Sequence, residues 1–295
     1  MKKMNVLVLG GTGYLGSKVV KALLEEGHRV VVAKRASADL SRFYSVLGDT
    51  SILSPEFVST DINDIDNCMI EIPLDLVLNM ACNYGRGNTP YSQVMEANFE
   101  FPSRVFAKAV EHGISSILTI GTSLPEDVNM YSFSKSILGD FGRFLALKHN
   151  IFFGHIKLEM FYGSDEPKER FISSLIRNML MGQEINVTLG TQLRDIISVS
   201  DVVDAILKIK SSGLSGYHEI GLGTGVAPSI RDIIGFIWKE TGEKSKINYG
   251  AIPMRAGEPD CIADISVLNE ICENWQPISW EEGLRKMICD IRKEG

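Results

Sequence analysis

The chain has 295 residues, enough for one large domain or two closely joined ones. Its composition, 44% hydrophobic and 23% charged residues, excludes a disordered chain, a collagen-like repeat and a membrane-embedded protein. The net charge of −7 excludes a general basic field, so nucleic acid is not an expected partner.

The cysteines and the N-terminal residues indicate the cellular compartment of the protein. The five cysteines are odd in number, form no CxxC pair and have no histidine at metal-ligand spacing, which predicts a reducing cytoplasm and no bound metal. The opening MKKMNVLVLGG has two lysines before an apolar run that glycines interrupt after about five residues. We therefore expect a cytoplasmic protein with no membrane partner.

Strands and helices alternate regularly in the first half of the chain. NVLVL at 5–9 is an apolar run bounded by glycines, typical of a strand buried in a parallel sheet, and a helical pattern follows from Tyr14 to Glu26. In chain order the alternation continues with a strand at 29–35, a strand at 56–60, a helix at 62–70, a strand at 75–81, a long helix through Asn98 to Glu111, a strand at 115–121, a helix at 132–149 and a strand at 151–158. Repeated βαβ units predict an α/β fold with a doubly wound parallel Rossmann sheet.

The pattern changes beyond residue 160 to loops, short strands and separate helices. Helices are predicted at 171–181, 200–211, 229–241 and 280–292. We therefore expect a dinucleotide-binding domain over 1–160, with returning segments near 191–222, and a smaller α/β substrate-binding lobe over 161–295.

A glycine-rich turn, GGTGYLG, joins the first strand to the first helix. Gly10 permits the tight turn, Gly13 lets the backbone approach a pyrophosphate, and Gly16 lets the helix lie close to the sheet. Backbone amides and the helix N-terminus then face the phosphates. This context predicts a dinucleotide site. Its other expected cofactor contacts are Thr12, Tyr14 and Leu15.

Two further segments are expected to hold the adenosine end of the cofactor. Lys34 and Arg35 end the second strand, where an NAD-preferring site usually has an acidic residue. A guanidinium there suits a 2′-phosphate, which favours NADP(H) over NAD(H). Asp39 lies nearby in sequence and keeps open the alternative that both cations are ordinary surface charges. Asp61 either holds the adenine amino group, with Ile62 packing on the ring, or caps the next helix.

The segment YSFSK provides a candidate for proton transfer. Tyr131 and Lys135 are one helical turn apart, so both side chains share a face, and the lysine charge is expected to lower the pKa of the phenol. Thr122 and Ser123 end the fifth strand at the same sheet edge, where one hydroxyl can hold a substrate oxygen.

Together these motifs resemble the extended short-chain dehydrogenase/reductases, in the branch of nucleotide-sugar epimerases, dehydratases and reductases. The resemblance covers essentially the whole chain. It also rests on Asp61-Ile62, NMA at 79–81, Asn98, QLRDIISVSDVVDAIL at 192–207, IGLGTGVAPSIRDI at 220–233 and PMRAGEPDCIADISVL at 253–268. Within the branch, KLEMFYG and TQLRDIISVSDVV look most like the CDP-abequose and CDP-paratose synthases, reductases of a CDP-linked 4-keto-3,6-dideoxyhexose in O-antigen deoxysugar synthesis.

The resemblance implies roles for residues that match its motifs. It implies Tyr131 as the acid, Lys135 as its partner, Thr122 as the hydroxyl that orients the carbonyl, and Asn98 as a support near the nicotinamide. The cofactor contacts implied after the fourth strand are Met80 and Ala81.

The resemblance also implies a substrate site. Arg194 and Arg255 would grip the nucleotide diphosphate, while Asn83, Thr122 and Ser123 would contact the sugar. The helices at 92–112 and 132–149 correspond to a pair that commonly joins two subunits of such enzymes, so a homodimer is expected.

The chain departs from the family pattern at two places. Many relatives have Arg and Asn where this chain has Lys157 and Met160, so one usual nucleotide contact is missing. Sugar dehydratases follow their threonine with Asp-Glu, whereas Ser123-Leu124 follows Thr122 here, which disfavours elimination of water.

Cofactor preference separates the candidate reactions. Epimerases and dehydratases recycle one bound NAD, whereas a net reductase draws hydride from an exchanging pool, so Arg35 favours a reductase. The leading hypothesis is an NADPH-dependent reductase of a nucleotide-linked 4-keto-6-deoxy or 3,6-dideoxy sugar, with Tyr131 as proton donor. The alternatives are an NAD-dependent nucleotide-sugar 4-epimerase and a non-catalytic NADP-binding regulatory protein. The Thr122, Tyr131 and Lys135 trio argues against the regulatory protein.

Overall fold

The structure is a computed structural model that describes residues 2–48, 54–254, 258–273 and 275–294. The chain divides into two compact units. The first contains 1–157 and 206–220, and the second contains 158–205 and 221–295. The segment that returns to the first unit is therefore narrower than the predicted 191–222.

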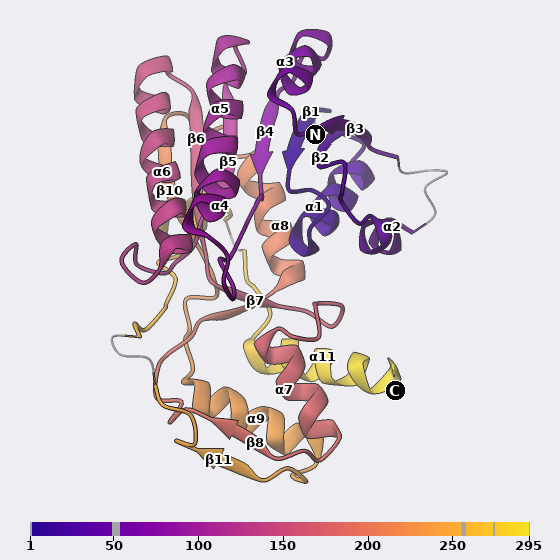
Figure 1. The fold of residues 1–295 in the computed structure, drawn as a ribbon, viewed down its shortest axis with the longest axis vertical. Coiled ribbons are helices and arrows are strands. Elements are labelled where there is room, and N and C mark those ends of the chain that lie inside the picture. Colours follow the sequence, from indigo (N-terminus) through magenta and orange to yellow (C-terminus); the bar gives the residue numbers. More distant parts are fainter. Residues whose placement is uncertain (1, 49–53, 255–257, 274, 295) are drawn as a thin grey trace. The chain divides into compact units, whose positions relative to one another are not determined.

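A seven-stranded sheet forms the centre of the first unit (Figure 1). Its strands are β1 (Asn5–Leu9), β2 (Arg29–Lys34), β3 (Glu56–Ser59), β4 (Leu76–Asn79), β5 (Ser116–Ile120), β6 (Phe152–Leu158) and β10 (Tyr217–Leu222). They lie in the order β3-β2-β1-β4-β5-β6-β10, and β1 pairs in parallel with both β2 and β4. The predicted doubly wound sheet is confirmed. The strand order reverses between β1 and β4, where ligands of such sheets bind beside the strands' carboxyl ends.

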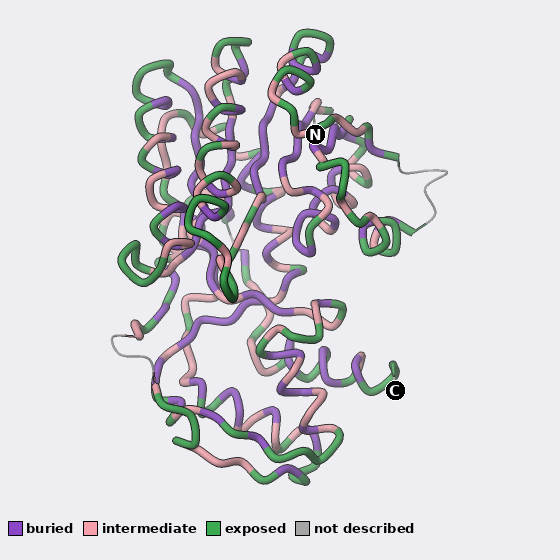
Figure 2. The backbone as a smooth tube through the Cα atoms, in the orientation of Figure 1, coloured by how far each residue is buried: buried purple, intermediate pink, exposed green. Residues whose placement is uncertain are grey.

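Helices cover this sheet and bury its strands. They are α1 (Tyr14–Glu25), α2 (Ser41–Leu47), α3 (Ile62–Glu71), α4 (Tyr91–Met95), α5 (Phe101–Glu111) and α6 (Met130–His149). A further helix, α8 (Val199–Lys210), begins in the second unit and ends in the first. Ile65 of α3, Phe106 of α5 and Leu138 of α6 belong to one buried cluster with Leu7 and Ile117 of the strands. The central strands are buried along most of their length, as their continuous apolar runs predicted (Figure 2).

The long helix predicted at 92–112 has three parts. A π-helix, η1 (Glu96–Glu100), lies between α4 and α5. Such wide turns are often found at functional sites, because they change the direction in which one side chain points. Asn98 is fully buried within η1.

The second unit has its own sheets and core. Its elements are β7 (Met160–Tyr162), α7 (Phe171–Leu180), β8 (Ile185–Val187), β9 (Ile196–Ser198), α9 (Ile230–Thr241), β11 (Ile247–Tyr249), α10 (Ser266–Ile271) and α11 (Trp280–Glu294). β7 pairs in parallel with β9, and β8 with β11. Ile176, Ile234 and Leu284, one from each long helix, meet in one core. The four helices predicted beyond residue 160 are confirmed as α7, α8, α9 and α11, whereas the short α2 and α10 were missed.

A buried ion pair ties the returning segment to the first βαβ unit. Lys210 at the end of α8 places its Nζ 2.9 Å from Glu26 Oε2, and the same carboxylate oxygen is 3.0 Å from His28 Nε2. The side chains of Lys210 and His28 are each 1% exposed. The segment 206–220 is therefore bonded to residues at the beginning of the chain.

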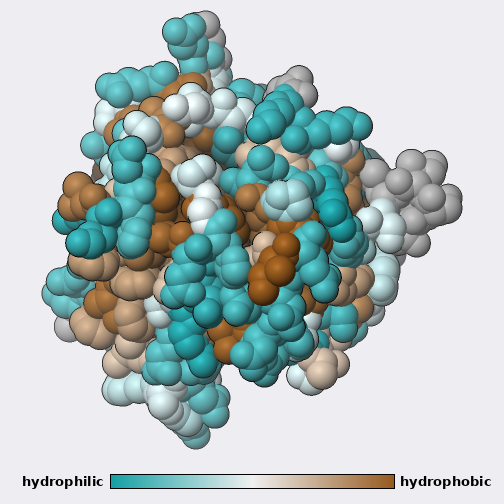
Figure 3. Space-filling model, turned by 90° about the horizontal axis from the view of Figure 1, so that it is seen from above, coloured by the Kyte–Doolittle hydropathy of each residue, from teal (hydrophilic) through white to brown (hydrophobic). Residues whose placement is uncertain are grey.

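Figure 3 shows the end of the first unit at which α5 and α6 finish, opposite the carboxyl ends of the strands. Hydrophilic residues cover much of this end. Ion pairs here join Lys2 to Asp75 and Asp66 to both Lys108 and His112. None of the helices in the described part of the chain has the length and hydropathy of a membrane span.

Candidate active site

The glycine turn folds tightly against the end of β4. Gly10 has a φ of +73°, and a Cβ on it would lie 2.5 Å from the Ala81 nitrogen and 2.6 Å from the Met80 carbonyl carbon. A Cβ on Gly16 would overlap the Gly10 carbonyl oxygen. Only glycine fits either position without movement of the backbone. Gly10 thus has the predicted turn role, and Gly16 packs against the turn itself.

The turn opens at Gly13, which is exposed and caps the N-terminus of α1. A Cβ there would meet only the Gly10 carbonyl oxygen, at 3.3 Å. The first turn of α1 has no acidic residue, so the helix dipole is not neutralised there. A backbone cradle, an open glycine and an uncompensated helix N-terminus fit the pyrophosphate of a dinucleotide.

Two side chains of the turn, Tyr14 and Leu15, are buried, whereas Gly13 is exposed. Tyr14 and Leu15 are each 8% exposed, and Lys18 lies 5.4 Å from the centre of the Tyr14 ring. Thr12 is partly exposed. Cofactor contacts by Thr12, Tyr14 and Leu15 stay predictions.

The residues expected at the adenosine end follow β2 and β3. Arg35 is exposed directly after β2, whereas Lys34 lies 5.6 Å from the centre of the Phe57 ring. Asp39 accepts a hydrogen bond from the Ser41 amide at 2.9 Å, which lowers the pKa of the carboxyl. The Asp39 carboxylate is thus held by the backbone at the start of α2. Arg35 is the exposed cation directly after β2.

Asp61 has the capping role that the sequence left open. Its Oδ1 accepts a hydrogen bond from the Asn63 amide at 2.8 Å at the start of α3. Ile62, the first residue of that helix, packs against the buried cluster of the first unit. Contacts of Asp61 and Ile62 with adenine stay predictions.

A capping box fixes the start of α6 and with it the candidate proton donor. Asn129 Oδ1 accepts from the Ser132 amide, and the Ser132 hydroxyl accepts from the Asn129 amide. Tyr131, between these residues, is hydrogen-bonded to Thr122, which follows β5 and is 9% exposed. Two elements far apart in the sequence thus bring a phenol and an alcohol together, as predicted. The role of Ser123 beside them stays a prediction.

The electrostatics of Tyr131 differ from the expectation. Burial raises the pKa of Tyr131 well above its usual value, and the nearby Cys82 and Tyr84 raise it further. The predicted net lowering of this pKa is therefore wrong for this structure, because burial disfavours the charged phenolate. The phenol remains protonated over the neutral range, which suits a proton donor.

Lys135 lies one turn beyond Tyr131 and reaches the end of β4. It is 2% exposed, and its Nζ donates a hydrogen bond of 2.7 Å to the Ala81 carbonyl. Burial lowers the pKa of the ammonium. The amine is thus fixed beside Met80 and Ala81, the segment against which Gly10 packs, and the two motifs meet at one edge of the sheet.

Asn98 clamps the loop that follows β4. Its Oδ1 accepts from the Asn83 amide at 2.7 Å, and its Nδ2 donates to the Asn83 carbonyl at 2.9 Å and to the Ser134 hydroxyl at 3.0 Å. The Asn83 side chain in turn accepts from the Gly85 amide at 3.0 Å. Asn98 therefore supports the site through this loop, and a sugar contact by Asn83 stays a prediction.

Two residues of this loop belong to the site although the sequence analysis omitted them. Burial raises the pKa of the Cys82 thiol, whereas the nearby Lys135, Tyr84 and Tyr131 lower it. The rings of Tyr84 and Tyr131 are 5.1 Å apart, and Arg86 lies 5.1 Å from the Tyr84 ring centre. Their position directly after β4 was the available signal, because the ends of parallel strands collect functional residues.

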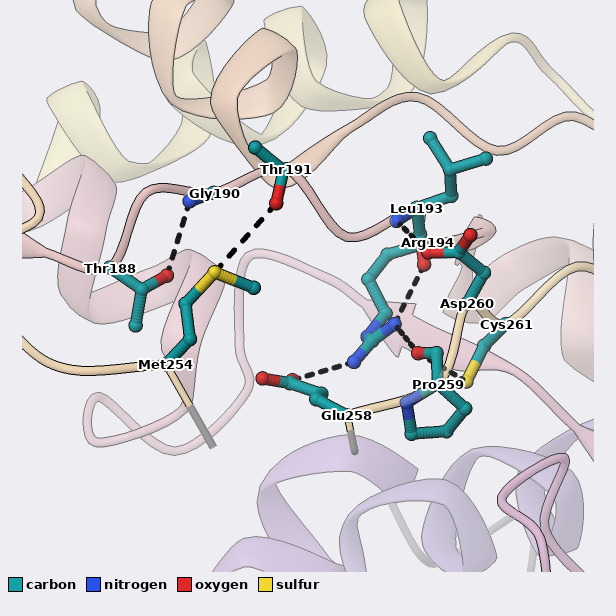
Figure 4. A network of polar contacts seen from close by, with 10 residues as sticks. All are labelled: Thr188, Gly190, Thr191, Leu193, Arg194, Met254, Glu258, Pro259, Asp260 and Cys261. Atoms are coloured by element: carbon teal, nitrogen blue, oxygen red, sulfur yellow. Dashed lines mark hydrogen bonds and ion pairs between the residues drawn. The ribbon is translucent and has the colours of Figure 1, made fainter. Parts of the chain in front are cut away.

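Arg194, in the second unit, is held within that unit (Figure 4). Its guanidinium donates to Glu258 Oε1 at 2.6 Å, to the Leu193 carbonyl at 2.7 Å and to the Pro259 carbonyl at 2.5 Å. Only 8% of the Arg194 side chain is exposed. Its contact with a diphosphate stays a prediction. Arg255 lies outside the described residues.

Comparisons with known proteins agree with this arrangement. A CDP-abequose synthase of Salmonella muenchen is 26% identical over 294 residues, covering 96% of each chain. A UDP-glucose 4-epimerase of Lactobacillus helveticus is 25% identical, covering 93% of this chain and 92% of its own length. The solved UDP-glucose 4-epimerase of Thermotoga maritima, with UDP-glucose, superposes with a TM-score of 0.83 at 22% identity over 99% of each chain. Residues 6–220 match the family described as "NAD dependent epimerase/dehydratase family". The chain belongs to the NAD dependent epimerase/dehydratase family.

Proposed function

We propose that this protein is an NADPH-dependent reductase of a nucleotide-linked 4-keto-6-deoxy or 4-keto-3,6-dideoxy sugar. The observation that carries the proposal is Tyr131, a phenol kept protonated by burial and hydrogen-bonded to Thr122 at the carboxyl edge of the sheet. A reductase must give a proton to the oxygen of the carbonyl that it reduces, and a protonated donor beside a carbonyl-orienting hydroxyl meets that need.

The glycine turn at Gly10, Gly13 and Gly16 would hold NADPH, which would supply the hydride for C4 of the sugar. Thr122 holds the carbonyl oxygen, and Tyr131 donates its phenolic proton to that oxygen as negative charge develops there. Lys135, fixed by the Ala81 carbonyl, supplies the positive charge that stabilises the tyrosinate. Asn98 keeps the loop after β4 in place during these steps.

The relatives support a nucleotide sugar as the substrate. They include CDP-abequose synthases, and a solved structure of similar fold contains UDP-glucose. In this chain Arg194 and Arg255 are the cations proposed to bind the diphosphate, while Asn83, Thr122 and Ser123 face the sugar. If the ion pair between Arg194 and Glu258 opened, the freed guanidinium N–H groups could donate to the diphosphate.

An NAD-dependent 4-epimerase is the second candidate, favoured by the relatives named UDP-glucose 4-epimerase. One experiment separates the two. The purified protein is given NADPH or NADH with CDP-, GDP-, UDP- and dTDP-linked 4-keto sugars, and oxidation of the nicotinamide is followed. Net oxidation of NADPH supports the reductase. Tightly held NAD and interconversion of epimers without oxidation of NADPH support the epimerase.

Substitution of Arg35 tests the proposed preference for NADPH over NADH. Arg35→Glu is expected to raise the KM for NADPH by about 10- to 100-fold, the value of a lost charge-assisted hydrogen bond, while the KM for NADH stays the same or falls. Steady-state kinetics with both cofactors measure this. Arg104→Glu, a charge reversal on exposed α5, is the control and should change neither KM. Equal effects on both cofactors would refute the proposed 2′-phosphate contact.

We further propose a homodimer formed through α5 and α6. Phe133, Phe144 and Leu147 of α6 are 42%, 59% and 80% exposed, more than large apolar side chains on a solvated helix usually are. Light scattering at several protein concentrations tests the assembly. A mass corresponding to one chain at every concentration would refute it.

A further inference from the structure

A histidine of β6 packs against two glycines that lie close in the chain to the proposed catalytic residues. His155 is 4% exposed. A Cβ on Gly121, at the end of β5, would overlap Nε2 of its ring, and a Cβ on Gly139 of α6 would overlap Nδ1. The imidazole thus fills the space that each glycine leaves, and it lies against the strand end and the helix at once.

A second ring of β6 meets α6 in the same way. A Cβ on Gly142 would overlap the ring of Phe153, which lies two residues before His155 and therefore on the same face of the strand. Gly139 and Gly142 are neighbours on one face of the helix. Two rings from one strand thus enter two hollows along one helix, which fixes α6 on β6 at two points.

Both hollows filled by the imidazole are next to residues of the proposed mechanism. Gly121 directly precedes Thr122, and its amide donates a hydrogen bond of 2.7 Å to a carbonyl of β6. Gly139 lies one helical turn beyond Lys135 and two beyond Tyr131, on the same face of α6. The position of the imidazole therefore affects how far the phenol and the amine lie from the threonine.

Stability alone does not account for a histidine at this place. Within the part of the chain that the structure describes, Nε2 of His155 has no hydrogen-bond partner, and Nδ1 lies 3.5 Å from the Tyr217 hydroxyl, at the limit of a hydrogen bond. Burial lowers the pKa of the imidazole to about 4, so the ring is neutral at neutral pH. A buried polar atom without a partner costs free energy that an apolar side chain would not. What the histidine supplies is a small flat ring that fits between two backbones.

We propose that His155 is a positioning residue of the active site. Its imidazole packs against Gly121 and Gly139 and thereby sets the distance from the end of β5 to the start of α6. The inference rests on the proposed reductase function, in which the carbonyl of the sugar must reach both Thr122 and Tyr131. A misplacement of about 1 Å lowers the rate of such a reaction by about 10²-fold. His155 acts through the strand and the helix, and not on the reacting atoms.

A double-mutant cycle tests this role with the keto sugar that the wild type reduces. Gly139→Ala places a methyl group against the ring and is expected to lower kcat about 10- to 100-fold. The KM for NADPH should change little, because the glycine turn is untouched. His155→Ala empties both hollows and should also lower kcat. In the His155→Ala background, Gly139→Ala should lower kcat no further, because the overlap is gone.

Two other helical glycines provide matched controls. Gly142→Ala crowds the same helix against Phe153, so His155→Ala should not relieve its effect. Gly235→Ala lies within α9, where a Cβ would meet no atom within 4 Å, and should leave kcat unchanged. A loss of kcat in Gly139→Ala that persists in full when residue 155 is alanine would overturn the proposal. A normal kcat in His155→Ala would overturn it too, whether or not Gly139→Ala folds.

Denaturant unfolding, which needs no substrate, separates positioning from a loss of stability. Gly139→Ala and Gly142→Ala should each lower the midpoint of unfolding, because each overfills a packed interface. For an equal loss of midpoint, Gly139→Ala should lose more of its kcat. Losses of kcat that follow stability alone would mean that His155 only packs the core, and would overturn its positioning role while leaving the reductase intact. A wild-type protein that reduces no 4-keto sugar instead overturns the reductase function and this role with it.

Discussion

Tyr131→Phe is expected to lower kcat by about 10²- to 10⁴-fold, the usual contribution of a positioned general acid. The change removes only the hydroxyl group, so the ring can still pack 5.1 Å from Tyr84 and the start of α6 keeps its capping box. Without a proton donor, charge builds up on the oxygen at C4 and the barrier rises. Affinity for NADPH should change little, because the glycine turn is untouched.

Two measurements check this result together. Titration of intrinsic fluorescence gives the dissociation constant of NADPH, and oxidation of NADPH in the presence of a keto sugar gives kcat. Tyr91→Phe removes a hydroxyl from a tyrosine that is 71% exposed on α4 and should leave both values unchanged. A Tyr131→Phe protein with nearly normal turnover would remove this phenol from the mechanism.

Gly10→Ala is expected to destabilise the protein by about 2 to 4 kcal/mol and to abolish tight cofactor binding. The residue needs a φ of +73°, and its new Cβ would also lie 2.7 Å or less from three atoms of Met80 and Ala81. Relief of that overlap must displace either the turn that faces the pyrophosphate or the carbonyl that holds Lys135.

Gly113→Ala is the matched control for this change. Gly113 follows α5 with the same φ of +73°, but a Cβ there would meet no atom within 4 Å. Backbone strain alone should then cost about 1 kcal/mol, and cofactor affinity should not change. Denaturant unfolding and NADPH titration of both variants measure the difference. Equal losses of stability would mean that the contact with β4 has no effect of its own.

The parts of the fold that depend on local periodicity could be predicted from the sequence. NVLVL is β1 because a continuous apolar run suits a strand covered on both faces, and the helical spacing from Tyr14 onward is α1. The π-helix around Asn98 could not be predicted, because an added residue per turn leaves the apolar pattern of a helix almost unchanged. The short α2 likewise gave too few turns for a period to be visible.

The candidate site, like the fold, could be predicted from the sequence only in part. YSFSK and the glycine turn could be found in the sequence, because each motif is defined by the spacing of residues along one helix or turn. The pKa of Tyr131 depends on how much protein surrounds the phenol and on Cys82 and Tyr84, which reach it from another loop. Arg194 is a cation in the sequence, but its guanidinium is bonded to Glu258, far along the chain. Such pairings are properties of the tertiary fold.

The buried contact of Lys210 with Glu26 has a consequence for how the chain is made. While the ribosome has released only the first 157 residues, β6 has a bare edge where β10 will pair, and the Glu26 carboxylate lacks its cation. The unpaired edge exposes the nascent chain to association with other chains. The first unit can therefore complete its sheet only after residue 220 has emerged, when part of the other unit has already been synthesised.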